Sequence, residues 1–180
     1  MRRVSLNVRA SQEALTDDQV QVVLIEIRHP LLTGDPVFGD AIRLSTDNAD
    51  EIQRDPHVRG TRSSWRGANP ITQPFIWVMA SALVPSDIDD QPAQARLVLE
   101  TIDPAMIDIC RSFRTPATVT MGVGFASTPD AMEQEWTQLQ LTTADASAGE
   151  IVLSMSREHI ELERYPSGRM SRSRFPGLYL

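Results

Sequence analysis

One apolar run limits how this chain can fold. It extends from Phe75 to Val84, is bracketed by Pro74 and Pro85, and is rich in aromatic and β-branched residues. Ten residues are too few to cross a bilayer as a helix. The run predicts a strand that is buried on both faces at the centre of a sheet, and its composition leaves a buried helix of three turns as the alternative.

Other segments show the two-residue alternation of half-buried strands. The alternating segments are 41–46, 97–101, 118–125, 138–142 and 151–156, and residues 20–27 predict a further strand that is apolar on both faces in its middle. The alternation is clearest over 118–125, where Gly122 and Gly124 fall on one face and predict that another part of the chain packs closely there. The last two segments, separated by a turn, predict a hairpin.

Helical signals are short. Residues 9–18 predict one or two turns with Ser11 as a possible N-cap, and residues 128–136 predict a turn that begins at Thr128-Pro129-Asp130. Asp103-Pro104 is a typical helix start, and the residues after it place Cys110 on the apolar face of a helix ending before Pro116. Residues 47–74 have no regular period, which predicts a long loop or a poorly paired hairpin projecting from the core.

These segments together predict a mainly β fold. We expect residues 1–180 to form a single-domain antiparallel β-sandwich or barrel with two or three short helices and a long loop at about 47–74. A length of 180 residues suffices for one domain with its own core. Residues 164–180 form a basic, aromatic C-terminal arm.

Charge is divided unevenly along the chain. All 17 basic residues are arginine. Residues 1–163 hold 13 Arg and 24 acids (13 − 24 = −11), and residues 164–180 hold 4 Arg and no acid, which gives the total of −7. The arm is therefore expected to lie on an acidic surface of its own or a neighbouring subunit, because an acidic body repels phosphate. Nucleic-acid binding by the arm is the alternative.

The search for catalytic and metal-binding patterns identifies none. The chain has no glycine-rich phosphate loop and no paired-histidine or paired-cysteine spacing, so we expect no enzyme, cofactor or metal site. His29 and His159 lie at predicted strand ends, where hydrogen bonding or a turn is their expected role. No signal or membrane-spanning segment is evident, so a protein synthesised and retained in a cytoplasm, or carried by a particle assembled there, is expected.

Arginine and aromatic residues, which are enriched at protein interfaces, mark two candidate contact regions. The interface candidates are Arg169, Arg172, Arg174, Phe175 and Tyr179 in the arm, and Arg59, Arg62 and Trp65 in the irregular region. A solvated loop with a self-docked arm is the alternative interpretation.

The order of short motifs along the chain resembles a known group of sequences. It runs through Val22-Val23-Leu24-Ile25-Glu26-Ile27-Arg28-His29-Pro30, Leu97-Val98-Leu99-Glu100-Thr101-Ile102-Asp103 and Arg174-Phe175-Pro176-Gly177-Leu178-Tyr179. These motifs resemble an uncharacterised family encoded in the tail modules of long-tailed bacteriophages and prophages, near the tape-measure gene. The resemblance covers roughly residues 10–180. Residues 47–74 depart from it, since they are longer and more basic than in the family pattern.

The resemblance implies a virion structural protein of the tail tip. Such a protein would form a homo-oligomeric ring, a hexamer or trimer, or an adaptor between the tail tube and the hub or baseplate. Its partners would be further copies of itself and the tail tube, tape-measure and hub proteins, with no membrane and no nucleic acid. It would be made in the bacterial host cytoplasm and located in the virion, and the family supplies no catalytic residues.

Two other functions stay open. A nucleic-acid-binding module would use the arginines of the irregular region and the arm. A tail-associated hydrolase would use Glu158 and Asp145 as acids, although no nucleophile or metal pattern accompanies them.

Overall fold

We describe the fold from a computed structural model. The structure describes residues 5–14, 19–34, 39–84, 94–100, 108, 112–147, 149–157, 173–174 and 176–178. Its strands are β1 (Gln21–Arg28), β2 (Ile42–Ser45), β3 (Asp50–Gln53), β4 (Val58–Thr61), β5 (Phe75–Trp77), β6 (Ala80–Leu83), β7 (Gln94–Leu99), β8 (Thr118–Phe125), β9 (Thr128–Ala146) and β10 (Ile151–Arg157). Its helices are α1 (Leu6–Glu13) and the 3-10 turns η1 (Pro30–Leu32), η2 (Trp65–Gly67) and η4 (Pro176–Leu178).

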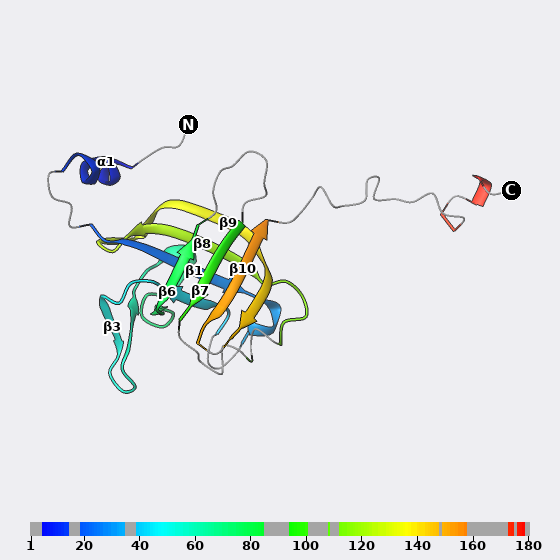
Figure 1. The fold of residues 1–180 in the computed structure, drawn as a ribbon, viewed down its shortest axis with the longest axis horizontal. Coiled ribbons are helices and arrows are strands. Elements are labelled where there is room, and N and C mark those ends of the chain that lie inside the picture. Colours follow the sequence, from blue (N-terminus) through cyan, green and yellow to red (C-terminus); the bar gives the residue numbers. More distant parts are fainter. Residues whose placement is uncertain are drawn as a thin grey trace.

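The ten described strands form one curled sheet, a half-barrel, in the order β3-β4-β5-β2-β1-β8-β9-β10-β7-β6 (Figure 1). The prediction of a mainly β fold is therefore confirmed. Neighbouring strands are antiparallel except β2 and β5, which pair in parallel. Among the described residues, no helix is long and apolar enough to cross a membrane.

The centre of the sheet is the β1–β8 pair, and the sequence predicted both strands, β1 from its apolar run and β8 from alternation. Every residue of β1 has a partner in β8, from Gln21 opposite Phe125 to Arg28 opposite Thr118. The inner face of the curl carries the main core, to which β1, β2, β7, β8, β9 and β10 all contribute buried apolar side chains. Burying one face of each strand in a common core requires the sheet to curl.

A smaller cluster lies on the outer face of β1. We call it the outer cluster; its buried members are Val22, Leu24, Trp65, Ala68 and Phe75. Gly122 and Gly124 allow the close approach that their positions predicted. A Cβ atom on Gly122 would lie 2.9 Å from Cζ2 of Trp65, and one on Gly124 would lie 2.9 Å from the carbonyl oxygen of Ala131.

The prediction of a single central strand over residues 75–84 is wrong. The segment is divided between β5 and β6, which lie near opposite ends of the strand order and are joined by Val78 and Met79. Only Phe75 is buried within it, whereas Met79 and Leu83 are 52% and 66% exposed. Composition identified the strand tendency correctly, but it carries no information about the place of a strand in a sheet.

Two helix predictions need correction. Residues 128–136 belong to β9, because Trp136 is buried opposite Met121 and pairing with β8 overrides the capping signal at Thr128. Ser11 lies inside α1, and the N-cap is Ser5. The Ser5 hydroxyl accepts from the Val8 N–H at 3.2 Å and donates to the Glu133 carboxylate at 2.6 Å.

The remaining sequence predictions have mixed outcomes. The strands predicted over 20–27, 41–46, 138–142 and 151–156 are confirmed, and the last two are paired as the β9–β10 hairpin. The strand predicted over 97–101 is present as β7, within the residues described there. Within residues 47–74, β3 and β4 pair as a short hairpin with a register shift between Glu51 and Gln53, and η2 follows. Most of the helix predicted over 103–113, with Cys110, lies outside the described residues.

Candidate functional site

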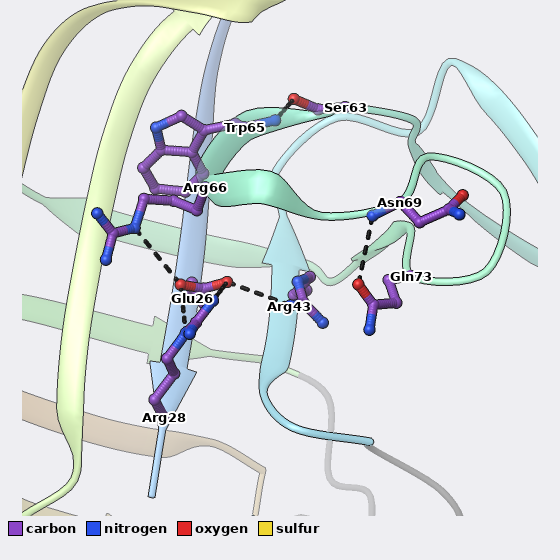
Figure 2. A network of polar contacts seen from close by, with 8 residues as sticks. All are labelled: Glu26, Arg28, Arg43, Ser63, Trp65, Arg66, Asn69 and Gln73. Atoms are coloured by element: carbon purple, nitrogen blue, oxygen red, sulfur yellow. Dashed lines mark hydrogen bonds and ion pairs between the residues drawn. The ribbon is translucent and has the colours of Figure 1, made fainter.

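A carboxylate buried beneath arginines is the most unusual chemical feature of the described structure. Glu26 lies in the middle of β1, on the outer face, and is 1% exposed. Arg28 follows two residues later on the same face, and Arg43 is directly opposite Glu26 on β2. Arg66 reaches the same carboxylate from η2. Figure 2 shows the three guanidinium groups converging on Glu26 from β1, β2 and η2. We call these four residues the arginine cluster.

The contacts within the cluster differ in strength. Arg28 holds Glu26 with two bonds, Nε to Oε1 at 2.8 Å and Nη2 to Oε2 at 3.1 Å. Arg43 approaches Oε2 with Nη2 at 3.3 Å, and Arg66 approaches Oε1 with Nε at 3.6 Å. The Arg66 Nη1 atom lies 3.9 Å from Oε1 of Glu135, which is at the rim. The paired Arg28 contact has the geometry of a strong charge-assisted bond, and the others are longer ion pairs.

Burial divides the three arginines into two kinds. The side chain of Arg43 is 6% exposed, and its Nε–H has no hydrogen-bond acceptor among the described residues. The side chains of Arg28 and Arg66 are 48% and 38% exposed. The hydrogen bond to Glu26 raises the pKa of the Arg28 guanidinium above its usual value, against the opposing effect of burial. Arg43 therefore stabilises the floor of the site, and Arg28 and Arg66 form its accessible rim.

The backbone holds Arg66 in an unusual conformation. Its φ is 59° and that of Gly67 is 74°, both in the left-handed region that residues other than glycine rarely adopt. The segment is held there by Trp65, which packs against Phe75 with ring centroids 5.8 Å apart. Thus a buried aromatic anchor places the next side chain over Glu26.

A second anchor connects the same segment to the start of β9. Asp130 Oδ1 accepts from the backbone N–H of Ser64 at 2.6 Å. The Ser63 hydroxyl donates to the carbonyl oxygen of Pro129 at 2.7 Å and lies 3.1 Å from Asp130 Oδ1. The Ser63 hydroxyl also accepts from the Trp65 N–H at 3.0 Å. The backbone hydrogen bond from Ser64 lowers the pKa of the Asp130 carboxyl.

This anchor predicts an acid-dependent loss of stability. Because the folded pKa of Asp130 lies below its unfolded value of about 3.9, its contribution is complete above that value and is lost as the pH falls through the folded pKa. We expect the unfolding free energies of the wild type and Asp130→Asn to differ near neutral pH and to converge in acid, in urea titrations at a series of pH values. A difference that is constant with pH would contradict the assignment.

The interface residues that the sequence predicted in the irregular region do not belong to the arginine cluster. Arg59 and Arg62 are exposed and donate within the β3–β4 region: Arg59 Nη1 to the carbonyl of Asn48 at 2.9 Å, and Arg62 Nη2 to that of Glu51 at 3.0 Å. Trp65 is only 7% exposed. Its indole packs in the outer cluster and is not presented on a contact surface, because the facing glycine leaves room for it on the sheet.

Of the five interface candidates in the arm, the structure describes Arg174. Arg174 is exposed in a turn, whereas Arg169, Arg172, Phe175 and Tyr179 lie outside the described residues. Of the two acids considered for a hydrolase, Asp145 is exposed in β9 and Glu158 lies outside the described residues.

Histidine 29 has the hydrogen-bonding role predicted for it. Its Nδ1 accepts from the Leu31 N–H at 3.1 Å, so Nε2 carries the hydrogen and donates to the Thr115 hydroxyl at 2.8 Å. Its ring stacks on Phe113 with centroids 4.3 Å apart. In the described part of the chain, no group of three or more His, Cys, Asp or Glu residues is placed to hold a metal ion.

Sequence reasoning missed the arginine cluster. One signal was available: Glu26 is a lone charge within an otherwise apolar strand, and a buried carboxylate requires partners. Comparison with known proteins adds no further residue, since the chain matches no protein-family model and no curated protein sequence.

Proposed function

We propose that this protein is a structural component of a bacteriophage or prophage tail tip, a ring or adaptor that joins the distal end of the tail tube to the hub or baseplate. The order of sequence motifs supports the proposal. The observation that carries it is the arginine cluster, which places two accessible arginines on the rigid outer face of an acidic protein.

The exposed arginines can contact an acidic surface on a neighbouring subunit. A ring of identical subunits needs two different surfaces that fit each other. The cluster holds three positive charges. The facing acids are the buried Glu26, Glu135 at the rim, and Asp40, which acts electrostatically on Arg28 (3 − 3 = 0). The side chains of Arg28 and Arg66 are partly exposed and present guanidinium N–H donors at the surface. Residues 1–163 carry a balance of −11. A carboxylate of a neighbouring copy or of another acidic tail protein would therefore meet two exposed guanidinium groups on an otherwise acidic body.

The proposal includes closure of the curled sheet into a barrel or sandwich. The two residues between β5 and β6 support this closure. The Val78 N–H donates to the carbonyl of Ser45, at the end of β2, at 3.0 Å, and the Met79 carbonyl accepts from the Glu100 N–H, just after β7, at 2.8 Å. One short segment thus makes bonds to both sides of the curl.

Deleting the gene from the phage or prophage that encodes it tests the proposal. We expect particles with incomplete tails, restoration of tails by the wild-type gene in trans, and stoichiometric presence of the protein in purified virions by mass spectrometry. Complete, infectious tails without the protein would refute the proposal.

A further inference from the structure

The acceptor capacity of Glu26 is smaller than the donor capacity around it. A carboxylate has two oxygens and about four lone-pair sites, whereas each guanidinium has five N–H donors. The four nitrogen approaches to Glu26, two from Arg28 and one each from Arg43 and Arg66, already engage both oxygens. The remaining N–H groups of the three arginines must find their acceptors elsewhere.

Most of the N–H donors that Glu26 cannot accept belong to Arg28 and Arg66. Arg28 engages Nε and Nη2 on Glu26, which leaves the donors of Nη1 and the second hydrogen of Nη2. Arg66 approaches Glu26 and Glu135 only at 3.6 and 3.9 Å, distances too long for good hydrogen bonds. Both side chains are partly exposed and are directed to the same buried carboxylate. Their outward N–H groups therefore belong to one rim, and the acids that face it are Glu135 beside Arg66 and Asp40, which acts electrostatically on Arg28.

Two further observations indicate a binding role in addition to a structural one. Arg43 is paired with Glu26, but its buried Nε–H has no acceptor among the described residues, so the floor of the site holds one unpartnered donor. Arg66 is held in left-handed backbone, and conformations of this kind persist where the surrounding structure imposes them and often at binding sites.

From this geometry we infer that the arginine cluster is an oxyanion receptor whose ligand is a carboxylate, bound between Arg28 and Arg66. Glu26 acts as the positioning residue that fixes both arginines, and Arg43 supplies additional buried positive charge. A planar carboxylate fits the paired N–H groups of a guanidinium. A nucleic-acid backbone is disfavoured relative to a single carboxylate, because its successive phosphates would also have to lie along the strongly acidic body beyond the two arginines.

That the cluster binds a carboxylate follows from its geometry alone. Which molecule supplies the carboxylate rests on the proposed function. In an assembled tail tip, an acidic side chain of a neighbouring subunit would occupy the site. A contact of this kind would add specificity of orientation, since it requires the neighbour to present one carboxylate at one place.

Titration of the purified full-length protein tests the inference directly. The probes are sodium acetate, sodium phosphate and a DNA oligonucleotide, each compared with sodium chloride at equal ionic strength. The readout is the nitrogen-15 NMR signal of the arginine Nε–H groups, assigned by substitution. We expect acetate to shift the Arg28 and Arg66 signals in a saturable way, with a Kd on the order of millimolar to tens of millimolar for a single small anion.

Variants make the test specific. Arg66→Asn tolerates the left-handed backbone and removes the guanidinium, and Arg28→Gln removes the other half of the rim. Each is expected to weaken acetate binding at least about tenfold while circular dichroism reports an intact fold. Arg96→Gln, which removes an exposed arginine on β7, is the matched control and should leave the binding unchanged.

Three results would overturn the inference. They are no response beyond that of chloride, a response that Arg96→Gln abolishes equally, and binding of phosphate and of a DNA oligonucleotide without binding of acetate. The last would assign the site to phosphate. If Arg66→Asn loses acetate binding but is incorporated into complete tails, the receptor stands and its proposed place in the assembly fails.

Discussion

Replacing Glu26 with glutamine is expected to lower the free energy of unfolding by about 3–5 kcal/mol, the cost of leaving a buried charge without its partner. Glutamine keeps the shape of the side chain but removes the negative charge that neutralises Arg43, whose side chain is 6% exposed. Arg28 and Arg66 would be repelled by the uncompensated charge and turn toward solvent. Urea unfolding monitored by circular dichroism measures the loss.

A pair of controls separates this effect from a general loss of charge. Glu51→Gln removes the acid from an exposed pair with Arg54, whose Nε lies 3.0 Å from Oε1, and should cost less than about 1 kcal/mol. In Glu26→Gln/Arg43→Met, the unpaired buried charge is gone, so part of the lost stability should return. If the double variant is less stable than Glu26→Gln by the full cost of Arg43→Met alone, the two residues are not coupled.

Trp65→Ala should destabilise the protein by about 3–5 kcal/mol, because it removes a large side chain from a packed site. The indole is 7% exposed, packs against Phe75, and covers the position where a Cβ on Gly122 would lie. Its loss leaves a cavity between the sheet and the segment that carries Arg66. Urea unfolding again gives the magnitude, and the acetate titration shows whether Arg66 remains in place.

Trp77→Ala is the matched comparison for this second substitution. Trp77 lies in β5 and is only partly buried, so the same change should cost clearly less. Equal losses at the two positions would show that the outer cluster does not depend on Trp65 as its anchor.

Sequence reasoning predicted the strands better than their arrangement. The β1 and β8 segments are recognisable because alternation or an apolar run repeats along consecutive residues. The division of residues 75–84 between β5 and β6 depends on which strands are neighbours, and no local pattern encodes this. At Thr128 a helix-capping signal gave way to long-range pairing with β8, since local propensity is weaker than burial of Trp136.

The candidate site was less predictable for the same reason. Glu26, Arg43 and Arg66 come from three separate segments of the chain and meet only through strand register and a loop that folds back over the sheet. The arginines that composition singled out, Arg59 and Arg62, instead donate to carbonyl groups within their own hairpin. A residue type can suggest an interface, but only the fold determines which arginines share a carboxylate.

The pairing of β1 with β8 has a consequence for how the protein acquires its fold. The paired residues are 90 to 104 positions apart in the chain, from 118 − 28 to 125 − 21. During synthesis β1 and β2 emerge from the ribosome long before β8 is made, so their apolar side chains stay exposed to solvent until β8 can pair with β1. The β8–β9–β10 meander is local and can form early, and closure of the long loop onto β1 is the slow step expected of such distant contacts. Until then the newly made chain exposes β1, which becomes the centre of the sheet. This partly folded chain is the species that a chaperone would have to protect from aggregation.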